Sequence, residues 1–334
     1  MIIYKDRRQP YIEIFNPKTG TLIRTNLLDK SGQETRTSPS CRYLPELIDI
    51  GIMGHCSNKT SCEKFGVKCY QGNQNEENMS FEKYKEIIDQ VKGYTFQVAL
   101  GGRGDPNKHE DFYQIVKYTR EKGIVPNLTT SGHNITNEEI EMIINYCGAV
   151  AISFYSKLGS NGQESNPETI EVINLFKSKM PTNIHYVINN KTIDEAILRL
   201  KGNYFPSGIN GVIFLLYKVV GNAINDHESA LIPDEKMKTF LDCVFKIQHP
   251  FKIGFDTCFF SHLVLYDDSL KNNPSVQACE SGKFSCYVSC KSRLFSCSFL
   301  QDCTDGIELT SDNFLESWNQ LISDEIIECP CLKR

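Results

Sequence analysis

A repeated alternation of strand and helix patterns between Leu47 and Phe255 constrains the fold of this 334-residue chain more than any other feature. Short apolar runs alternate with amphipathic segments, and six strand-then-helix units follow one another. Consecutive units of this kind predict an α/β fold with a parallel sheet and right-handed crossovers. The expected strands are 47–53, 95–100, 124–128, 149–154, 184–188, 211–216 and 251–255, and the expected helices are 81–92, 109–122, 137–146, 167–179, 193–201 and 234–247.

Local cap signals support three of these helices. Ser80 can cap the first, Thr136 and Glu139 form a capping box, and Asn166-Pro167 offers a cap and a first helical residue. Before the repeat, the runs 11–15 and 21–25 flank a turn sequence and predict a β-hairpin. We therefore expect a hairpin preface over 1–46, the α/β repeat over 47–257 and a cysteine-rich α+β appendage over 258–334.

Three cysteines follow the first strand of the repeat directly. Cys56, Cys62 and Cys69 lie on the loop from Gly54 to Gly72, outside the carboxyl end of a strand, where parallel sheets bind their ligands. Three thiols on one loop predict one metal site. A structural zinc takes four ligands, and a 4Fe-4S cluster held by protein alone usually takes four cysteines, so three leave one iron open. A zinc site with a fourth ligand and ordinary free thiols remain alternatives.

Composition excludes several classes of protein. The net charge is -5 and no basic run occurs, so nucleic acid is not a favoured partner. No stretch of about 18 apolar residues exists, so we expect no membrane partner. The first eight residues carry charges where a signal peptide needs apolar residues. Of 14 cysteines, nine lie from Cys243 onward, which in a chain without an export signal indicates metal binding or catalysis in a reducing cytoplasm.

The cysteine loop resembles the cluster loop of the radical S-adenosylmethionine (SAM) superfamily, although its spacers of five and six residues exceed the usual three and two. After the second strand, the sequence Gly-Gly-Arg-Gly-Asp-Pro at 101–106 resembles the Gly-Gly-Glu-Pro motif of that family. After the third strand, 127–132 resembles its Thr-Asn-Gly segment. Glycines at such positions let the backbone approach a ligand closely. The resemblance covers roughly residues 45 to 255.

This resemblance implies a partial (β/α)6 TIM-type barrel with its site at the carboxyl ends of the strands. It implies that Cys56, Cys62 and Cys69 hold a 4Fe-4S cluster and that SAM binds the fourth iron. Asp105 would take the role of the family's carboxylate toward the SAM amino group, and the sixth strand would pack near the adenine. The SAM-binding residues implied are Gly101, Gly102, Gly104, Asp105, Thr130, Ser131, Ser153, Asn189 and Leu216.

A second group of cysteines follows the repeat. Cys279 and Cys297 flank a hairpin pattern in which Ser292 stands where a glycine usually turns the chain, and a helix over 313–322 leads to Cys329 and Cys331. The arrangement resembles the Twitch or shortened SPASM appendage of radical SAM enzymes. This implies an auxiliary 4Fe-4S cluster bound by those four cysteines. A zinc ribbon is an alternative, as are Cys303 for one of the last pair and Cys286 or Cys290 within the hairpin.

Cys258 follows the last strand of the repeat and could face the reaction chamber. We expect a catalytic cysteine that donates a hydrogen atom to a substrate radical. Ligation of the auxiliary cluster and a buried inert thiol are alternatives.

The activity implied is reductive cleavage of SAM to a 5'-deoxyadenosyl radical, which removes hydrogen from a substrate. A flavodoxin- or ferredoxin-type protein would supply the electron. The expected substrate is a ribosomally made peptide that undergoes a cross-link, a thioether bond or an epimerisation. Oxidation of a small alcohol or sugar-like metabolite is the alternative reaction, and a noncatalytic zinc protein is the alternative from another class.

Overall fold

A computed structural model describes residues 1–56, 61–71, 75–230 and 234–323. Its centre is one sheet with the strand order β10-β9-β8-β7-β6-β5-β4-β11-β12-β13. Neighbouring strands from β10 to β11 are parallel, so the carboxyl ends of the strands of the repeat share one edge of the sheet. The strands of the repeat are β4 (Leu47–Met53), β5 (Gln97–Gly102), β6 (Val125–Thr130), β7 (Val150–Ser153), β8 (Thr182–Ile188), β9 (Gly211–Leu216) and β10 (Lys252–Phe255).

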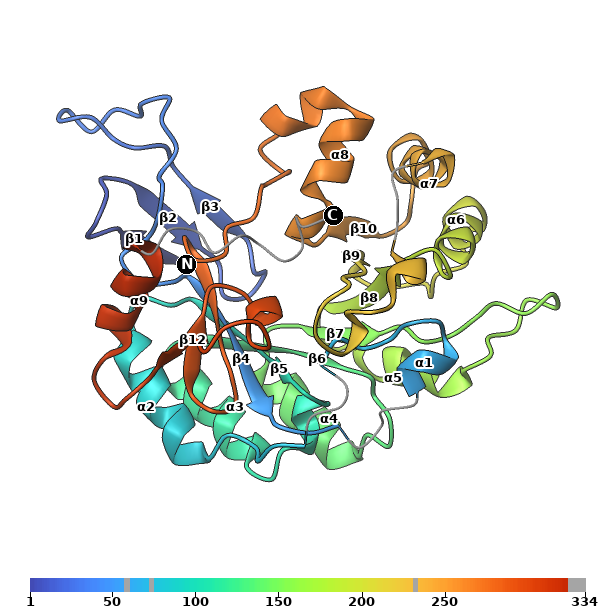
Figure 1. The fold of residues 1–334 in the computed structure, drawn as a ribbon, viewed down its shortest axis with the longest axis horizontal. Helices are drawn as coiled ribbons and strands as arrows, with labels where there is room; N and C mark the ends of the chain where they lie inside the picture. Colours follow the sequence, from blue (N-terminus) through green and yellow to red (C-terminus); the bar gives the residue numbers. More distant parts are fainter. Residues whose placement is uncertain (57–60, 72–74, 231–233, 324–334) are drawn as a thin grey trace.

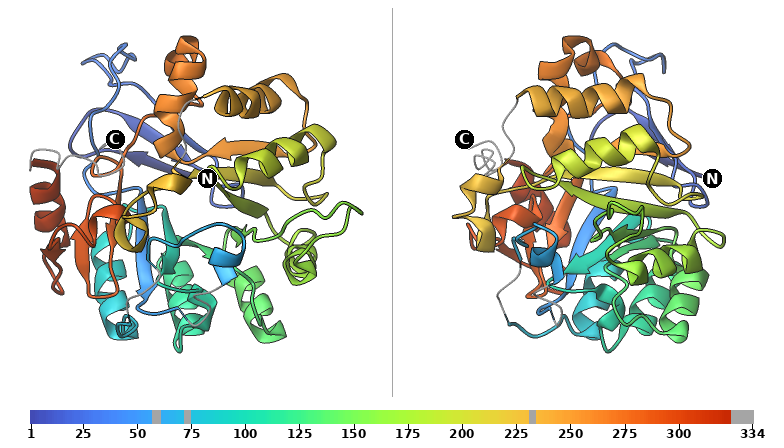
Figure 2. Two further views of the ribbon diagram at one scale, coloured as in Figure 1. Left: turned by 45° about the vertical axis from the view of Figure 1, so that its right-hand side comes forward. Right: turned by 90° about the vertical axis from the view of Figure 1, so that its right-hand side faces the viewer.

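A helix of at least ten residues follows each of the first six strands, and these helices cover the outer face of the curved sheet (Figures 1 and 2). The predicted series of strands and helices is confirmed, with boundaries that differ by at most three residues. Ser80 caps the first of these helices and the Thr136 capping box is formed, as expected. The helices are α2 (Phe81–Val91), α3 (Phe112–Glu121), α4 (Asn137–Tyr146), α5 (Pro167–Phe176), α6 (Ile193–Gly202) and α7 (Glu235–Lys246).

The cap predicted at Asn166 is wrong in one respect. Pro167 is the first residue of α5, but the Asn166 side chain makes no cap hydrogen bond. Its amide donates instead to the backbone carbonyl of Tyr155, 3.0 Å away. The side chain therefore holds the loop after β7 rather than capping the helix. A short amide side chain can form a hydrogen bond with the backbone of either segment.

The N-terminal region forms three strands instead of the expected two. The hairpin of β2 (Ile12–Phe15) and β3 (Leu22–Arg24) is confirmed, and β1 (Ile2–Lys5) adds to it as an antiparallel neighbour of β2. Phe15 stacks on Phe96 with ring centroids 5.0 Å apart. This contact packs the small sheet against the segment that leads into β5.

The C-terminal hairpin joins the sheet of the repeat. Strand β11 (Ser285–Val288) lies parallel to β4, and β12 (Arg293–Phe295) and β13 (Ile307–Glu308) follow as antiparallel neighbours. Ser292 turns the hairpin with a φ of 55°, a left-handed conformation that glycine adopts more readily than other residues. Helix α9 (Phe314–Ser323) carries the fully buried Trp318, whose Nε1 donates to the backbone carbonyl of Arg42.

The two faces of the strands differ in burial. On the face toward the helices, side chains such as Ile48, Val98 and Ile184 are completely buried. On the opposite face, Asn127 and His185 are only half-buried and line a cavity of about 320 Å³ with residues of the N-terminal hairpin. The inner face of the sheet is therefore hollow near the amino ends of its strands, where polar and apolar residues line the cavity together. No helix in the described parts of the chain is long and apolar enough to cross a membrane.

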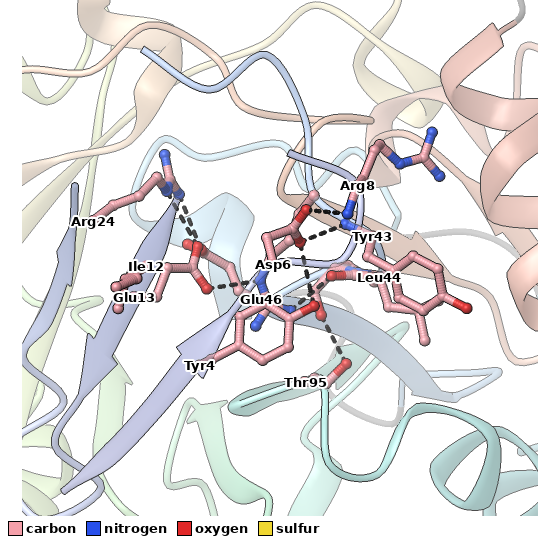
Figure 3. Close-up of polar contacts among 12 residues, drawn as sticks. Tyr4, Asp6, Arg8, Ile12, Glu13, Arg24, Tyr43, Leu44, Glu46 and Thr95 are labelled. Carbon is pink, nitrogen blue, oxygen red and sulfur yellow. Dashed lines mark hydrogen bonds and ion pairs between the residues drawn. The ribbon is translucent and has the colours of Figure 1, made fainter. Parts of the chain in front are cut away.

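A buried ion network joins the N-terminal hairpin to the sheet and to the appendage. Glu13 and Arg42 are both fully buried, with Oε2 and Nε 2.7 Å apart. Arg24 reaches Glu13 at 3.3 Å, Glu46 at 2.9 Å and Glu280 at 2.7 Å. Figure 3 shows Arg24, Glu13 and Glu46 turned toward one another. Burial, with the adjacent Glu13 carboxyl, raises the pKa of Glu46 from 4.5 to about 8.

The raised pKa of Glu46 predicts how the stability of the protein depends on pH. The folded state keeps a proton on Glu46 that the unfolded state releases above pH 4.5. The contribution of Glu46 to the free energy of unfolding therefore falls as the pH rises from 4.5 through about 8. Glu46→Gln mimics the protonated form. We therefore expect the free energy of unfolding of Glu46→Gln to increase relative to that of the unmodified protein as the pH rises from 5 to about 8. Urea unfolding measures both values. A parallel pH dependence in the two proteins would contradict this, and Glu86→Gln at an exposed ion pair is the control.

Candidate functional site

The cysteine loop begins where β4 ends and is held by backbone contacts at its base. The Gly54 N–H donates to the side-chain oxygen of Asn78, and the Gly54 carbonyl accepts from the N–H of Glu76 at 3.1 Å. A single turn of helix, α1 (Ser61–Lys64), carries Cys62. The loop therefore leaves the sheet and returns to it within a few ångströms, so its thiols stay near the carboxyl edge.

The three thiols of the loop lie within electrostatic reach of one another. Burial raises the pKa of Cys62 to about 12, and the neighbouring Cys69 and Cys56 add to the rise. Burial also raises the pKa of Cys69, again with a contribution from Cys56. No disulfide joins them in the part of the chain that the structure describes. That the three thiols bind one metal cluster stays a prediction.

A buried thiol binds a metal only after it releases its proton. The positive irons of a cluster lower the pKa of nearby thiols, so the three thiols of the loop suit such a cluster. In a 4Fe-4S cluster each cysteine binds a different iron, so the ligands share a neighbourhood without meeting at one point. Among the described residues, no group of three or more His, Cys, Asp or Glu side chains is placed to hold a metal ion.

The glycine-rich turn after β5 packs directly on the start of the cysteine loop. A Cβ on Gly102, whose φ is 111°, would lie 2.7 Å from the carbonyl oxygen of Met53. A Cβ on Gly104, whose φ is 147°, would lie 2.5 Å from the carbonyl oxygen of His55. Only glycine fits both positions. At Gly101, by contrast, a Cβ would meet no atom within 4 Å, so this residue borders open space.

Asp105 and Ser131 are brought together from the ends of β5 and β6. The Asp105 carboxylate accepts from the Ser131 N–H at 2.7 Å and from its hydroxyl at 2.5 Å. Thr130 is almost fully buried, and its hydroxyl donates to Asn107 at 2.8 Å. Two of the residues that the sequence assigned to SAM binding therefore form one polar unit, while Thr130 lies among buried neighbours.

Asn189, at the end of β8, holds the cysteine loop. Its side chain is fully buried, and its amide donates to the carbonyl of Gly66 at 2.8 Å. The loop after β9 makes a second attachment, because the Asn222 amide donates to the carbonyl of Cys69 at 3.3 Å. Leu216, at the end of β9, is half-buried. The adjacent strand ends thus position the loop that carries the thiols.

Sequence reasoning missed Tyr155, whose side chain forms a hydrogen bond with the thiol of Cys62. Ser153, which ends β7, in turn bonds the side chain of Tyr155. Asn222 was missed as well. Both residues lie just beyond the ends of strands, so extending the strand-end rule by a few residues would have found them.

A second group forms from Cys258, Cys279 and Cys297. Burial raises the pKa of Cys297 to about 12, and the nearby Cys258 and Cys279 raise it further. Cys258 reaches this group from the turn after β10 (Thr257–Phe259). Cys329 and Cys331 lie outside the described residues.

The three alternate cysteines have other surroundings. Cys286 is buried in the main core on β11, and Cys290 contacts Glu76 with 3.5 Å between its sulfur and Oε2. Cys303 is exposed, and its thiol donates to the carbonyl of Phe299 at 3.7 Å.

The appendage touches the cysteine loop. The Tyr70 hydroxyl lies 3.1 Å from the hydroxyl of Ser298, and its ring packs against Phe299 with centroids 4.7 Å apart. The segment after Cys297 therefore contacts the residue after Cys69. The two groups of thiols are linked through a few side chains.

Two ionisable side chains on the sheet were not found from the sequence. Desolvation by the surrounding sheet raises the pKa of Asp49, on β4, although its side chain is exposed, and lowers the pKa of the half-buried His185, on β8. Asp49 lies in register with Ala99 of β5 and Tyr287 of β11. Both shifts favour the neutral form of the side chain.

Solved structures of other proteins share the fold of this chain. No family model matches the chain, and no curated protein matches it. The solved structure of Streptococcus suis SuiB bound to the precursor peptide SuiA matches with a TM-score of 0.66, 15% identity and coverage of 85% of this chain and 67% of SuiB. Native anSMEcpe with bound AdoMet matches with a TM-score of 0.58, 15% identity and coverage of 83% of this chain and 82% of anSMEcpe. Both are radical SAM enzymes.

The chain has the fold of the radical SAM enzymes. The expected α/β class with a large, mainly parallel sheet is confirmed. SuiB has also been solved with S-adenosylmethionine, with a TM-score of 0.64 to this chain, 15% identity and coverage of 83% of this chain and 66% of SuiB. The chain thus spans about two thirds of SuiB. In the radical SAM fold, the thiols of Cys56, Cys62 and Cys69 lie at the edge where parallel sheets bind ligands.

Proposed function

We propose that this chain is a radical SAM enzyme in which Cys56, Cys62 and Cys69 bind three irons of a 4Fe-4S cluster and SAM binds the fourth. The grouping of these thiols beside the glycine-rich turn, at the carboxyl edge of the sheet, carries the proposal. When bound, the cluster and SAM together supply a 5'-deoxyadenosyl radical that takes a hydrogen atom from the substrate. The strands β4 to β9 with their helices then correspond to the partial (β/α)6 barrel over 47–257.

The chain's own residues bind and orient SAM. Gly101, Gly102 and Gly104 let the backbone approach the methionine moiety, and Asp105, held by Ser131, accepts a hydrogen bond from its amino group. Asn189 keeps the cysteine loop in place through Gly66. Thr130, Ser153 and Leu216 complete the strand-end set. The substrate binds beside the thiols at the carboxyl ends of the strands, and closure around it excludes water from the radical.

We also propose an auxiliary 4Fe-4S cluster held by the appendage over 258–334. Cys258, Cys279 and Cys297 supply three ligands, and Cys329 or Cys331 supplies the fourth. This revises the role expected for Cys258, because its thiol lies close enough to Cys297 to influence its pKa. The alternates Cys286, Cys290 and Cys303 are not needed in this set.

Replacing Cys258 with alanine separates its two roles. If Cys258 is a ligand, we expect the iron content after anaerobic reconstitution to fall from about eight to about four per chain, while SAM cleavage without substrate persists. If it donates hydrogen instead, the iron content stays at about eight. Iron and labile sulfide are measured together. Cys303→Ala is the matched control and should retain all of the iron.

The proposed substrate is a ribosomally made peptide, modified by a cross-link, a thioether bond or an epimerisation. The support is that SuiB was solved with the precursor peptide SuiA and anSMEcpe with a bound peptide, each protein sharing this fold at 15% identity. A flavodoxin- or ferredoxin-type protein would donate the electron, in a cytoplasm that keeps the cysteines reduced.

Anaerobic reconstitution with iron and sulfide tests the function. We expect a brown protein that, with dithionite and SAM, forms 5'-deoxyadenosine detectable by chromatography and mass spectrometry. A colourless protein that holds stoichiometric zinc, or a brown protein that forms no 5'-deoxyadenosine, would overturn the proposal.

A further inference from the structure

Asp49 faces the inner side of the sheet, where its side chain is exposed. Its neighbours Ile48 and Ile50 are completely buried toward the helices, and side chains alternate between the two faces of a strand. The Asp49 carboxylate forms no hydrogen bond or ion pair with any residue that the structure describes. A ligand on the inner face can therefore reach its oxygens directly.

The residues beside Asp49 leave space on the side of the glycine-rich turn. Ala99 lies in register with Asp49 on β5 and brings only a methyl group to this face. Two residues further along the same pair of strands stand Gly51 and Gly101, which are also in register. The Tyr287 hydroxyl covers Gly51, whereas a Cβ on Gly101 would meet no atom within 4 Å. The open path from Asp49 toward the turn therefore runs along β5.

This path is short. A strand rises about 3.3 Å per residue, so the level of Asp49 and Ala99 lies about 6.6 Å from that of Gly101. The proposed function places Gly101 beside the methionine moiety of SAM. A group that binds at Asp49 and extends along β5 therefore reaches the SAM site within a few bond lengths.

Two tyrosines lie near the carboxylate. Asp49 contributes to the raised pKa values of Tyr287, its partner on β11, and of Tyr70, which directly follows Cys69. The Tyr287 hydroxyl donates to Gln301 at 3.0 Å, and the Tyr70 hydroxyl accepts from the amide of Gln71 at 2.8 Å. Both phenols thus have other partners, and their rings stand close to a carboxylate that neither of them neutralises.

This chemistry suits a cation. An ionised carboxylate only accepts hydrogen bonds, so its ligand must bring donors. Desolvation by the surrounding sheet disfavours the charge of Asp49, and no cation of the described chain offsets this effect. An ammonium group supplies the opposite charge and the N–H donors together, and charge-assisted hydrogen bonds are the stronger kind. Nearby aromatic rings attract a cation as well.

We propose that Asp49 binds an ammonium group of the substrate on the inner face of the sheet, beside the SAM site. The inference rests on the proposed function, because the position of SAM makes this contact decide which carbon of the substrate lies within reach. The ammonium group belongs either to the N-terminus of a peptide or to a lysine side chain.

Saturation-transfer NMR titration of the reconstituted protein, with and without saturating SAM, tests this. Three probes of similar size are used: norleucine amide has only an α-ammonium group, Nα-acetyl-lysine amide has only a side-chain ammonium group, and Nα-acetyl-norleucine amide has neither. Asp49→Asn keeps the shape of the side chain and removes its charge. We expect this variant to weaken binding of an ammonium probe by at least about tenfold.

Asp194→Asn is the matched control. Asp194 pairs with Lys236 on the outer helices, and both side chains are exposed, so this variant should bind the probes like the unmodified protein.

The probes separate the two sources of the ammonium group. Binding of norleucine amide alone identifies the N-terminus of a peptide, and binding of Nα-acetyl-lysine amide alone identifies a lysine side chain. Equal binding of the uncharged probe, no binding of either ammonium probe, or equal affinity in Asp49→Asn overturns the inference. Displacement of the probes by SAM also overturns it, since Asp49 would then serve the amino group of SAM.

The melting temperature guards against misfolding of the variant. Because no described residue pairs with the carboxylate, Asp49→Asn should melt no lower than the unmodified protein. A lower melting temperature would show that the folded chain already pairs Asp49 and would overturn the inference. Failure of the unmodified protein to cleave SAM would instead defeat the proposed function, while ammonium binding, measured without turnover, would still report on Asp49.

Discussion

Replacing Cys56, Cys62 and Cys69 together with alanine is expected to abolish reductive cleavage of SAM and to remove about half of the iron. The proposed function assigns the three neighbouring thiols of the loop to one cluster and the thiols of the appendage to the other. Formation of 5'-deoxyadenosine with dithionite measures the first effect, and iron analysis after anaerobic reconstitution measures the second.

The matched control replaces three cysteines outside both groups, Cys41, Cys147 and Cys243, with alanine. This variant should retain the iron and the SAM cleavage of the unmodified protein. If the first triple variant still forms 5'-deoxyadenosine, the cluster is held elsewhere and the assignment of the loop is wrong. Loss of all iron would instead show that the two groups of thiols do not bind independently.

Replacing Glu13 with glutamine is expected to lower the free energy of unfolding by about 3–5 kcal/mol. Both Glu13 and Arg42 are fully buried, and the variant leaves the Arg42 guanidinium without its carboxylate. Arg24 loses its interaction with the Glu13 carboxylate at the same time. Glutamine has nearly the shape of glutamate, so the loss comes from charge and not from packing. Urea unfolding at pH 7 measures the change.

Glu86→Gln is the control for this prediction. Glu86 pairs with Lys83 at 2.9 Å, but both side chains are substantially exposed, and exposed pairs of this type contribute about 0.3–0.5 kcal/mol. If Glu13→Gln proves no more destabilising than this control, water reaches the network and Arg42 keeps its hydration. Such a result would also remove the basis for the raised pKa of Glu46.

Much of the candidate site could be predicted because strand ends are local features. Parallel strands end at one edge of a sheet, so locating the strands also located Gly102, Ser131 and Asn189. The structure then assigned Asn189 a contact that the pattern does not contain, with the carbonyl of Gly66. The hydrogen bond from Tyr155 to Cys62 joins residues more than 90 positions apart. No local periodicity encodes such a pair.

The amino-acid sequence by itself determined the order of strands and helices, the three-cysteine loop and the glycine turn, because hydrophobic period, caps and turn residues act over a few neighbours. Only the tertiary structure decided that β11 extends the sheet beside β4, that Cys258 and Cys279 influence the pKa of Cys297, and that Arg103 meets Asp302 across the chain. These contacts form only when elements that are distant in the sequence pack against one another. Each segment pairs according to the burial and charge that distant segments present, which its own sequence does not specify.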